Sequence, residues 1–170
     1  LVAVVGGDFP PNGLTFLEER GIDLEGLEVI PDGKTFRWSG RYHYDLNMRD
    51  TLATELNVFE HFDPKIAERD RKIRSVCLGN IDPVLQRKVL QQMDGPRVVV
   101  CDTMNYWITG ARPALEAVLK EVDILLVNDG EVRQLTQEYS LIKAYRAGQL
   151  NATQAAFFQE RQPEELYDLQ

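Results

Sequence analysis

The sequence has little positive charge and almost no histidine, and both shortages exclude a class of protein. It carries 19 Lys and Arg residues against 27 Asp and Glu residues among 170, a net charge of -8. Nucleic-acid binding needs a basic face for the phosphates, so nucleic acid is excluded as a partner. The only histidines, His43 and His61, are too isolated to predict a metal site.

Cysteines and long apolar runs are also scarce. Cys77 and Cys101 both fall within predicted buried strands, where cysteine behaves as a small hydrophobic residue rather than as a disulfide partner. No leader peptide and no apolar run long enough for a membrane span is recognisable. We therefore expect a cytoplasmic protein with no membrane partner.

Two short β-prone runs, at 98–101 and 124–127, dominate what the sequence does contain. A helical pattern at 113–122 separates them, which predicts a βαβ unit with a parallel pair of strands. Both runs are apolar on both faces, so we expect helices on both sides of the sheet. The hydrophobic content of 44% is enough to bury the core of one α/β domain.

Further βα elements and a C-terminal tail extend this pattern. The spacing of apolar residues predicts two more strands and two more helices, at 1–5, 14–20, 76–78 and 84–93. The tail, 139–170, has no β-prone run, and we expect helices there that begin near Asn151 and Pro163. We expect Phe157 and Phe158 in this tail to be buried against another part of the protein or a partner.

The segment 34–59 changes to a period of two, which predicts an antiparallel β-hairpin inserted between the βα units. Its aromatic stripe must be covered by the parent domain, a partner chain or a ligand. Packing or dimerisation accounts best for that stripe, which consists of Trp38, Tyr42 and Tyr44. The opposite side chains could reach a polar ligand, although a solvated face explains the arginines equally well: Arg37, Arg41 and Asn57.

Polar side chains follow three of the predicted strands, at Asn80, Asp102 and Asn128. In open α/β sheets, ligands bind at the carboxyl ends of the strands, so we expect these residues to share one edge. The pair Asn128 and Glu131 could orient a phosphate and hold a hydrated Mg²⁺ ion. The same spacing also describes a helix capping box, and the spacing alone favours that structural role.

The series of motifs along the chain resembles the ribokinase-like, or PfkB-type, carbohydrate kinase family. It consists of Gly6-x-Asp8-Phe9, Gly21-Ile22-Asp23, the Lys34-Thr35 hairpin, Asp102-x-x-Asn105-x-Trp107 and Asn128-x-x-Glu131. The resemblance covers residues 1–138. It implies a mostly parallel central sheet flanked by helices, with 34–59 as a lid hairpin that closes over substrate and often forms a dimer interface.

The resemblance also implies a function. It predicts transfer of the γ-phosphoryl group of ATP, with Mg²⁺, to a hydroxyl of a sugar, a nucleoside or a related small alcohol. Glu131 would serve the metal ion. Phosphate binding would fall to Asn128, Asp102 and Asn105, and substrate binding to Asn57, Asn80, Arg37 and Arg41.

The sequence departs from the family pattern at several places. The family's Asp-x-Asn-x-Arg motif has one extra residue before Asn105 and no arginine after it, and the family's first glycine-rich motif would precede Leu1. No Gly-x-Gly-Asp segment occurs, so no anion hole and no catalytic base are assigned, and we expect this chain alone to be inactive as a kinase. A non-catalytic interaction or dimerisation module is the alternative. A dinucleotide-binding domain would need a glycine fingerprint that the sequence lacks.

Overall fold

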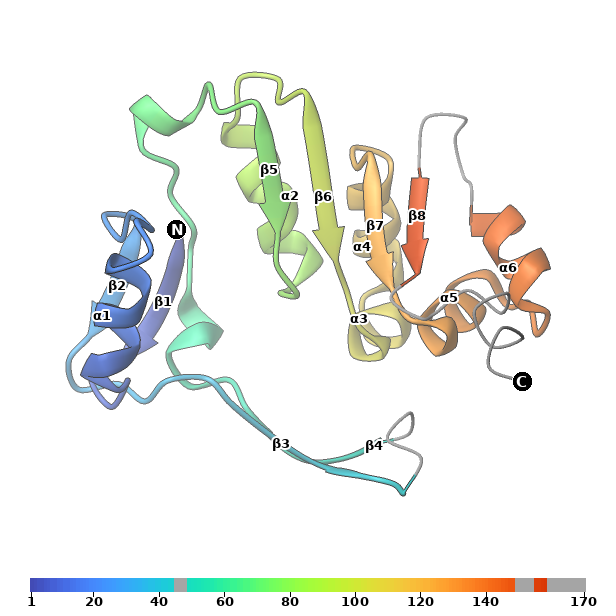
Figure 1. Cartoon of the computed structure of the whole chain (residues 1–170), viewed down its shortest axis with the longest axis horizontal. Helices are drawn as coiled ribbons and strands as arrows, with labels where there is room; N and C mark the ends of the chain where they lie inside the picture. Colours follow the sequence, from blue (N-terminus) through green and yellow to red (C-terminus); the bar gives the residue numbers. More distant parts are fainter. Residues whose placement is uncertain (45–48, 149–154, 159–170) are drawn as a thin grey trace, which may run out of the picture. The chain divides into compact units, whose positions relative to one another are not determined.

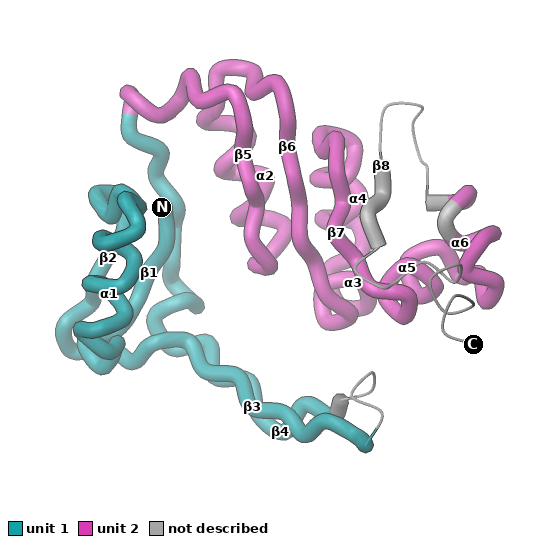
Figure 2. Tube along the Cα trace, viewed as in Figure 1, with its two compact units in different colours: residues 1–67 teal, residues 68–170 magenta. Residues whose placement is uncertain are grey.

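A computed structural model describes residues 1–44 and 49–148, and the backbone of residues 155–158. The chain forms two compact units, Leu1–Ala67 and Glu68–Gln170 (Figure 2). The first unit contains two two-stranded sheets and the second a four-stranded sheet. Together they confirm the predicted mixed α/β fold with parallel strands and an inserted antiparallel hairpin.

The first unit opens with a small parallel sheet made by β1 (Ala3–Gly6) and β2 (Leu27–Ile30), joined by α1 (Pro11–Glu18). The helix begins earlier than the predicted start at 14 because Pro11 supplies the fixed φ that favours a first helical position. The short strand β2 was not predicted. Gly21, with φ of +71°, lies in the left-handed conformation expected for the residue that ends the helix.

The predicted hairpin is confirmed, with different bounds. It consists of β3 (Arg37–Tyr42) and β4 (Arg49–Glu55), which are antiparallel with a register shift between Ser39 and Gly40. We expected the second strand to run to residue 59, and this was wrong. The extended backbone ends after Glu55, because Leu56 has helical backbone angles (φ -67°, ψ -39°). A 3-10 helix, η1 (Asn57–His61), follows, and its first residue, Asn57, takes a positive φ of 52°.

The second unit contains a parallel sheet of four strands in the order β5-β6-β7-β8 (Figure 1). A short 3-10 helix, η2 (Glu68–Asp70), precedes the first strand. The strands are β5 (Ser75–Leu78), β6 (Val98–Asp102), β7 (Ile124–Val127) and β8 (Ala155–Phe158). The helices are α2 (Pro83–Gln92), α3 (Asn105–Gly110), α4 (Arg112–Leu119), α5 (Asp129–Thr136) and α6 (Leu141–Gly148).

The core of this unit lies on one face of the sheet. Leu78, Val99 and Cys101 share that face and pack against Leu90 of α2 and Val118 of α4. The alternate side chains face the other way, and there Cys77 is exposed and Leu126 is 39% exposed. The prediction that Cys77 is buried was therefore wrong. Among the described residues, helices cover one face of these strands rather than both.

The tail is helical only in part. Helix α6 agrees with the prediction, but residues 155–158 form β8, which pairs in parallel with β7. The expected helix starts at Asn151 and Pro163 lie outside the described residues, as do the side chains of Phe157 and Phe158. Within the part of the chain that the structure describes, no helix is both long and apolar enough to cross a lipid bilayer.

Candidate functional site

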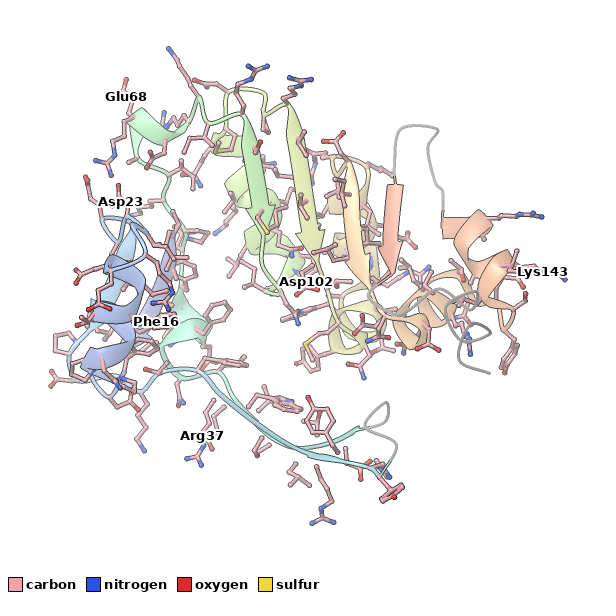
Figure 3. All side chains as sticks on the ribbon, viewed as in Figure 1. Phe16, Asp23, Arg37, Glu68, Asp102 and Lys143 are labelled. Carbon is pink, nitrogen blue, oxygen red and sulfur yellow. The ribbon has the colours of Figure 1, made fainter. Side chains whose placement is uncertain are left out.

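The predicted edge of polar residues is present in the second unit. Parallel register sets Leu78 beside Cys101 and Asp102 beside Leu126, so β5, β6 and β7 end at the same edge. Figure 3 shows Asp102 at the end of β6. Asn80 and Asn128 follow the ends of the neighbouring strands, as expected.

Gln86 ties two of these strand ends together. Its Nε2 donates hydrogen bonds to the carbonyl oxygens of Gly79 (2.8 Å) and Asp102 (3.0 Å). The side chain is fully buried, and its Oε1 has no partner among the described residues. One amide nitrogen therefore joins the backbone at the ends of β5 and β6, just beyond their last paired residues.

Sequence reasoning missed Gln86, although a signal was available. It lies four residues before Leu90 on α2, and Leu90 is a core residue, so both fall on the inward face of the helix. A polar residue on an apolar helix face is a candidate for a buried hydrogen bond. The carbonyl oxygens that it meets could not be deduced from the pattern.

Asp102 lies in an environment that disfavours its charge. Desolvation raises the pKa of the Asp102 carboxyl above its usual value, and a hydrogen bond from the backbone of Thr103 opposes this in part. The neighbouring thiol is more strongly affected, because burial raises the pKa of Cys101 to about 12. Cys101 is therefore a protonated, unreactive core residue, whereas Asp102 is a half-buried carboxylate that a nearby cation would stabilise.

The raised pKa of Asp102 predicts how stability depends on pH. The folded state binds the Asp102 proton more tightly than the unfolded state, so the stabilisation is full below the unfolded pKa and is lost as pH rises through the folded pKa. Asp102→Asn is therefore expected to raise the melting temperature slightly at neutral pH and to leave it unchanged at acid pH. Thermal unfolding across this range measures the difference, with exposed Asp94→Asn as the control. Equal effects of both substitutions at all pH values would contradict the prediction.

Asn80 contacts α3 rather than standing alone. The indole Nε1 of Trp107 donates to Asn80 Oδ1 at 3.1 Å, and the Tyr106 ring meets the Trp107 ring edge to face, with centroids 4.8 Å apart. Asn105, the first residue of α3, is exposed, and its Oδ1 accepts from the Tyr106 amide at 3.1 Å. The structure thus brings Asn80 and the Asn105 segment together at one edge.

The pair Asn128 and Glu131 forms a capping box at the start of α5. Asn128 Oδ1 accepts from the Glu131 amide at 2.9 Å, and Glu131 Oε2 accepts from the Asn128 amide at 3.1 Å. Glu131 is 7% exposed. The structural role that the spacing favours is therefore present, and it holds both side chains in fixed positions beside the strand end.

These residues fit a hydrated metal ion better than a fully enclosed one. No group of three or more His, Cys, Asp and Glu side chains that could hold a metal occurs among the described residues. Mg²⁺ usually keeps several waters and takes one or two carboxylates together with phosphate oxygens. Glu131 could supply one such carboxylate, with water between it and the ion because Oε2 already accepts a backbone hydrogen bond.

The remaining predicted residues lie in the first unit, where Thr35 is the centre of a hydrogen-bond network. Its Oγ1 accepts from the Gly6 amide and donates to Asp8, whose carboxylate also accepts from the Thr35 amide; these hydrogen bonds lower the pKa of Asp8. Asn57 Nδ2 donates to the Thr35 carbonyl oxygen at 2.9 Å. Asn57 therefore has a local structural role at the base of the hairpin, and Arg37 and Arg41 are exposed on β3.

Comparison with solved structures gives the fold. The chain superimposes on a candidate ribokinase II from E. coli with a TM-score of 0.73 and 17% identity, covering 94% of this chain and 56% of that one. A candidate ribokinase II from E. coli in complex with ATP and Mg²⁺ gives 0.65 and 19%, with 86% and 51% covered. A Burkholderia thailandensis nucleoside kinase in complex with inosine gives 0.62 and 14%, with 86% and 49% covered.

This likeness shows a ribokinase-like fold. No family model matches the sequence. No curated protein matches it either. The chain spans about half the length of these solved structures. The ribokinase-like fold inferred from the series of motifs is confirmed.

Proposed function

We propose that this chain is part of an ATP-dependent kinase that phosphorylates a hydroxyl of a sugar, a nucleoside or a related small alcohol, with Mg²⁺ accompanying ATP. The observation that carries the proposal is the shared edge of β5, β6 and β7, where Asn80, Asp102 and the Asn128–Glu131 pair converge. A structure of the same fold contains ATP and Mg²⁺. We also propose a cytoplasmic location.

In this proposal the phosphates of ATP lie against Asn128, Asp102 and Asn105. Asn128 begins α5, where backbone amides and the helix dipole favour a phosphate. The charge on Asp102 is disfavoured by desolvation, so a cation at the phosphates stabilises it. Glu131 would hold Mg²⁺ through water, and the bound ion would neutralise phosphate charge.

For binding of the acceptor, the second unit offers Asn80, and the first unit separately offers residues of the hairpin. Arg37 and Arg41 are exposed and could reach a polar substrate, while Asn57 fixes the base of the hairpin. We assign no catalytic residue, because the sequence contains no Gly-x-Gly-Asp segment. The described residues contribute binding and positioning, which is most of what a protein supplies to phosphoryl transfer.

The test is isothermal titration of ATP into the chain with and without Mg²⁺. Glu131→Gln keeps an acceptor for the capping box but removes the charge, so the fold is retained and Mg-ATP affinity is expected to fall roughly 10- to 100-fold. Glu138→Gln, just beyond α5, is the matched control and should bind like the unmodified chain.

Binding that does not depend on Mg²⁺, or that is equal in the two variants, would overturn the metal role of Glu131. Absence of any Mg-ATP binding would overturn the proposed function for this chain. That result would favour an interaction module that dimerises through the hairpin. The observation that favours this second function is that the hairpin exposes large apolar side chains, with Tyr42 54% and Leu52 58% exposed.

A further inference from the structure

We propose that Asn80, Tyr106 and Trp107 form an uncharged shelf that selects a neutral, hydroxylated ring as the phosphoryl acceptor. The proposal rests on the proposed kinase function and adds a specificity determinant to it. Tyr106 and Trp107 were not among the residues that the sequence assigned to binding. The shelf belongs entirely to the second unit, at the edge that carries Asp102.

The shelf is held in place before any ligand binds. Trp107 belongs to α3, and its indole donates to Asn80 on the loop after β5. Gln86 also contacts this loop, because its Nε2 donates a hydrogen bond to the Gly79 carbonyl oxygen. The same nitrogen donates to the Asp102 carbonyl oxygen. The backbone that precedes Asn80 and the backbone of Asp102 are therefore neighbours at the same strand ends.

The hydrogen bond to Trp107 also fixes which atom Asn80 offers to a ligand. An indole N–H can only donate, so its partner must be the amide oxygen of Asn80. The amide nitrogen then points away from the indole, and it has no partner among the described residues. It carries two N–H groups that can donate to hydroxyl oxygens, while Asp102 can accept from a hydroxyl hydrogen.

The fold does not need the two aromatic rings for its core. Helix α3 is anchored by Ile108, which is 2% exposed and packs with Leu115 and Leu119. Tyr106 is 57% exposed, and its ring meets Trp107 edge to face. An exposed tyrosine and a half-buried tryptophan beside the Asn80 amide match a ring with an apolar C–H face and hydroxyl groups at its rim.

Charge favours a neutral ring over an anionic one. The segments that form this edge, 75–82, 98–110 and 124–131, contain no lysine and no arginine. They do contain acidic residues, Asp102 among them. In the proposed function the phosphates of ATP are accompanied by Mg²⁺, which neutralises their charge. A carboxylate or phosphate on the acceptor ring would have no such ion and would meet like charge and no counter-charge from these segments, so the edge discriminates against it.

The test uses the fluorescence of Trp107 in a Trp38→Phe background, since the sequence contains 2 tryptophans. The probes are matched pairs, inosine with inosine 5′-monophosphate and D-ribose with D-ribose 5-phosphate. We expect a saturable change with inosine and D-ribose, and several-fold weaker binding of each phosphorylated partner. Asn80→Ala should weaken binding roughly fivefold through loss of a donor. Tyr106→Ala should weaken it about tenfold through loss of ring contact.

Tyr139→Ala is the matched control, because Tyr139 is 94% exposed in the same unit and makes none of these contacts. Equal binding of neutral and phosphorylated probes, or no change with any probe, would overturn the proposal. Free hypoxanthine acting as strongly as inosine would overturn the assignment to a hydroxylated ring. The Trp107 indole resonance in the NMR spectrum should shift in Asn80→Ala, which checks that the hydrogen bond was lost while the fold remained.

These measurements contain neither ATP nor Mg²⁺, so the two proposals can fail separately. If Mg-ATP titration shows no binding while the neutral probes still bind, the kinase function fails and the shelf remains. If Mg-ATP binds and the probes do not, the shelf fails alone.

Discussion

Replacing Gly6 with alanine is expected to lower the free energy of unfolding of the first unit by about 3 kcal/mol or more. A Cβ atom on Gly6 would lie 2.4 Å from the Gly33 carbonyl oxygen and 2.6 Å from the Thr35 amide nitrogen. Both are backbone atoms at the base of the hairpin, and neither can move aside as a flexible side chain could. The clash also separates the Gly6 amide from Thr35 Oγ1, which accepts its hydrogen bond.

Urea unfolding followed by Trp38 fluorescence, in a Trp107→Phe background, measures this loss. Gly110→Ala is the matched control, because a Cβ atom there would meet nothing within 4 Å. Gly110 is the last residue of α3, where alanine is at least as well tolerated as glycine. A Gly6→Ala variant as stable as the control would show that the hairpin base is not packed against β1 as described.

Replacing Gln86 with leucine is expected to cost about 2 kcal/mol in the second unit, because the carbonyl oxygens of Gly79 and Asp102 lose their shared donor. Leucine is similar in size and removes the unpartnered Oε1, so the loss reports on the two carbonyl oxygens rather than on a cavity. The ends of β5 and β6 should then move relative to each other. We therefore expect the NMR resonance of the Trp107 indole to shift, because the indole donates a hydrogen bond to Asn80, in the loop that Gln86 contacts.

Gln91→Leu on the same helix provides the comparison, since Gln91 is exposed. Urea unfolding followed by Trp107 fluorescence, in the Trp38→Phe background, should show a loss only for the Gln86 variant. If Gln86→Leu is as stable as Gln91→Leu and leaves the indole resonance in place, Gln86 does not determine the geometry of the edge.

The strands that carry the site could be predicted because their sequences are strongly β-prone. The runs at 98–101 and 124–127 are observed as Val98–Asp102 and Ile124–Val127, within one residue of expectation. Strand β8 was missed because alanine has weak β-propensity, and pairing with β7 rather than local preference makes 155–158 a strand. Exposure of Cys77 was missed because an apolar run does not show which face a helix covers.

Only those features of the candidate site that follow from the order of the parallel strands could be predicted. Parallel strands place Asn80, Asp102 and Asn128 at one edge whatever the details of packing, so spacing was sufficient for them. The hydrogen bond from Trp107 Nε1 to Asn80 Oδ1 joins residues 27 positions apart, and no periodic pattern in the sequence predicts it. Asn57 was placed on a strand because the alternation of apolar residues continues past Glu55. Its positive φ and its hydrogen bond to the Thr35 carbonyl oxygen, 22 positions away, leave no trace in that alternation.

The strand order in the second unit has a consequence for synthesis of the chain. Neighbours in space are neighbours in sequence throughout β5-β6-β7-β8, so no strand has to enter between two that are already paired. As the polypeptide leaves the ribosome, β6 can add to β5, and β7 to β6, each with its connecting helix. Among the described strands, the sheet therefore grows in one direction, from β5 towards β8. The strand ends that carry Asn80 and Asp102 are formed before β8 has been translated.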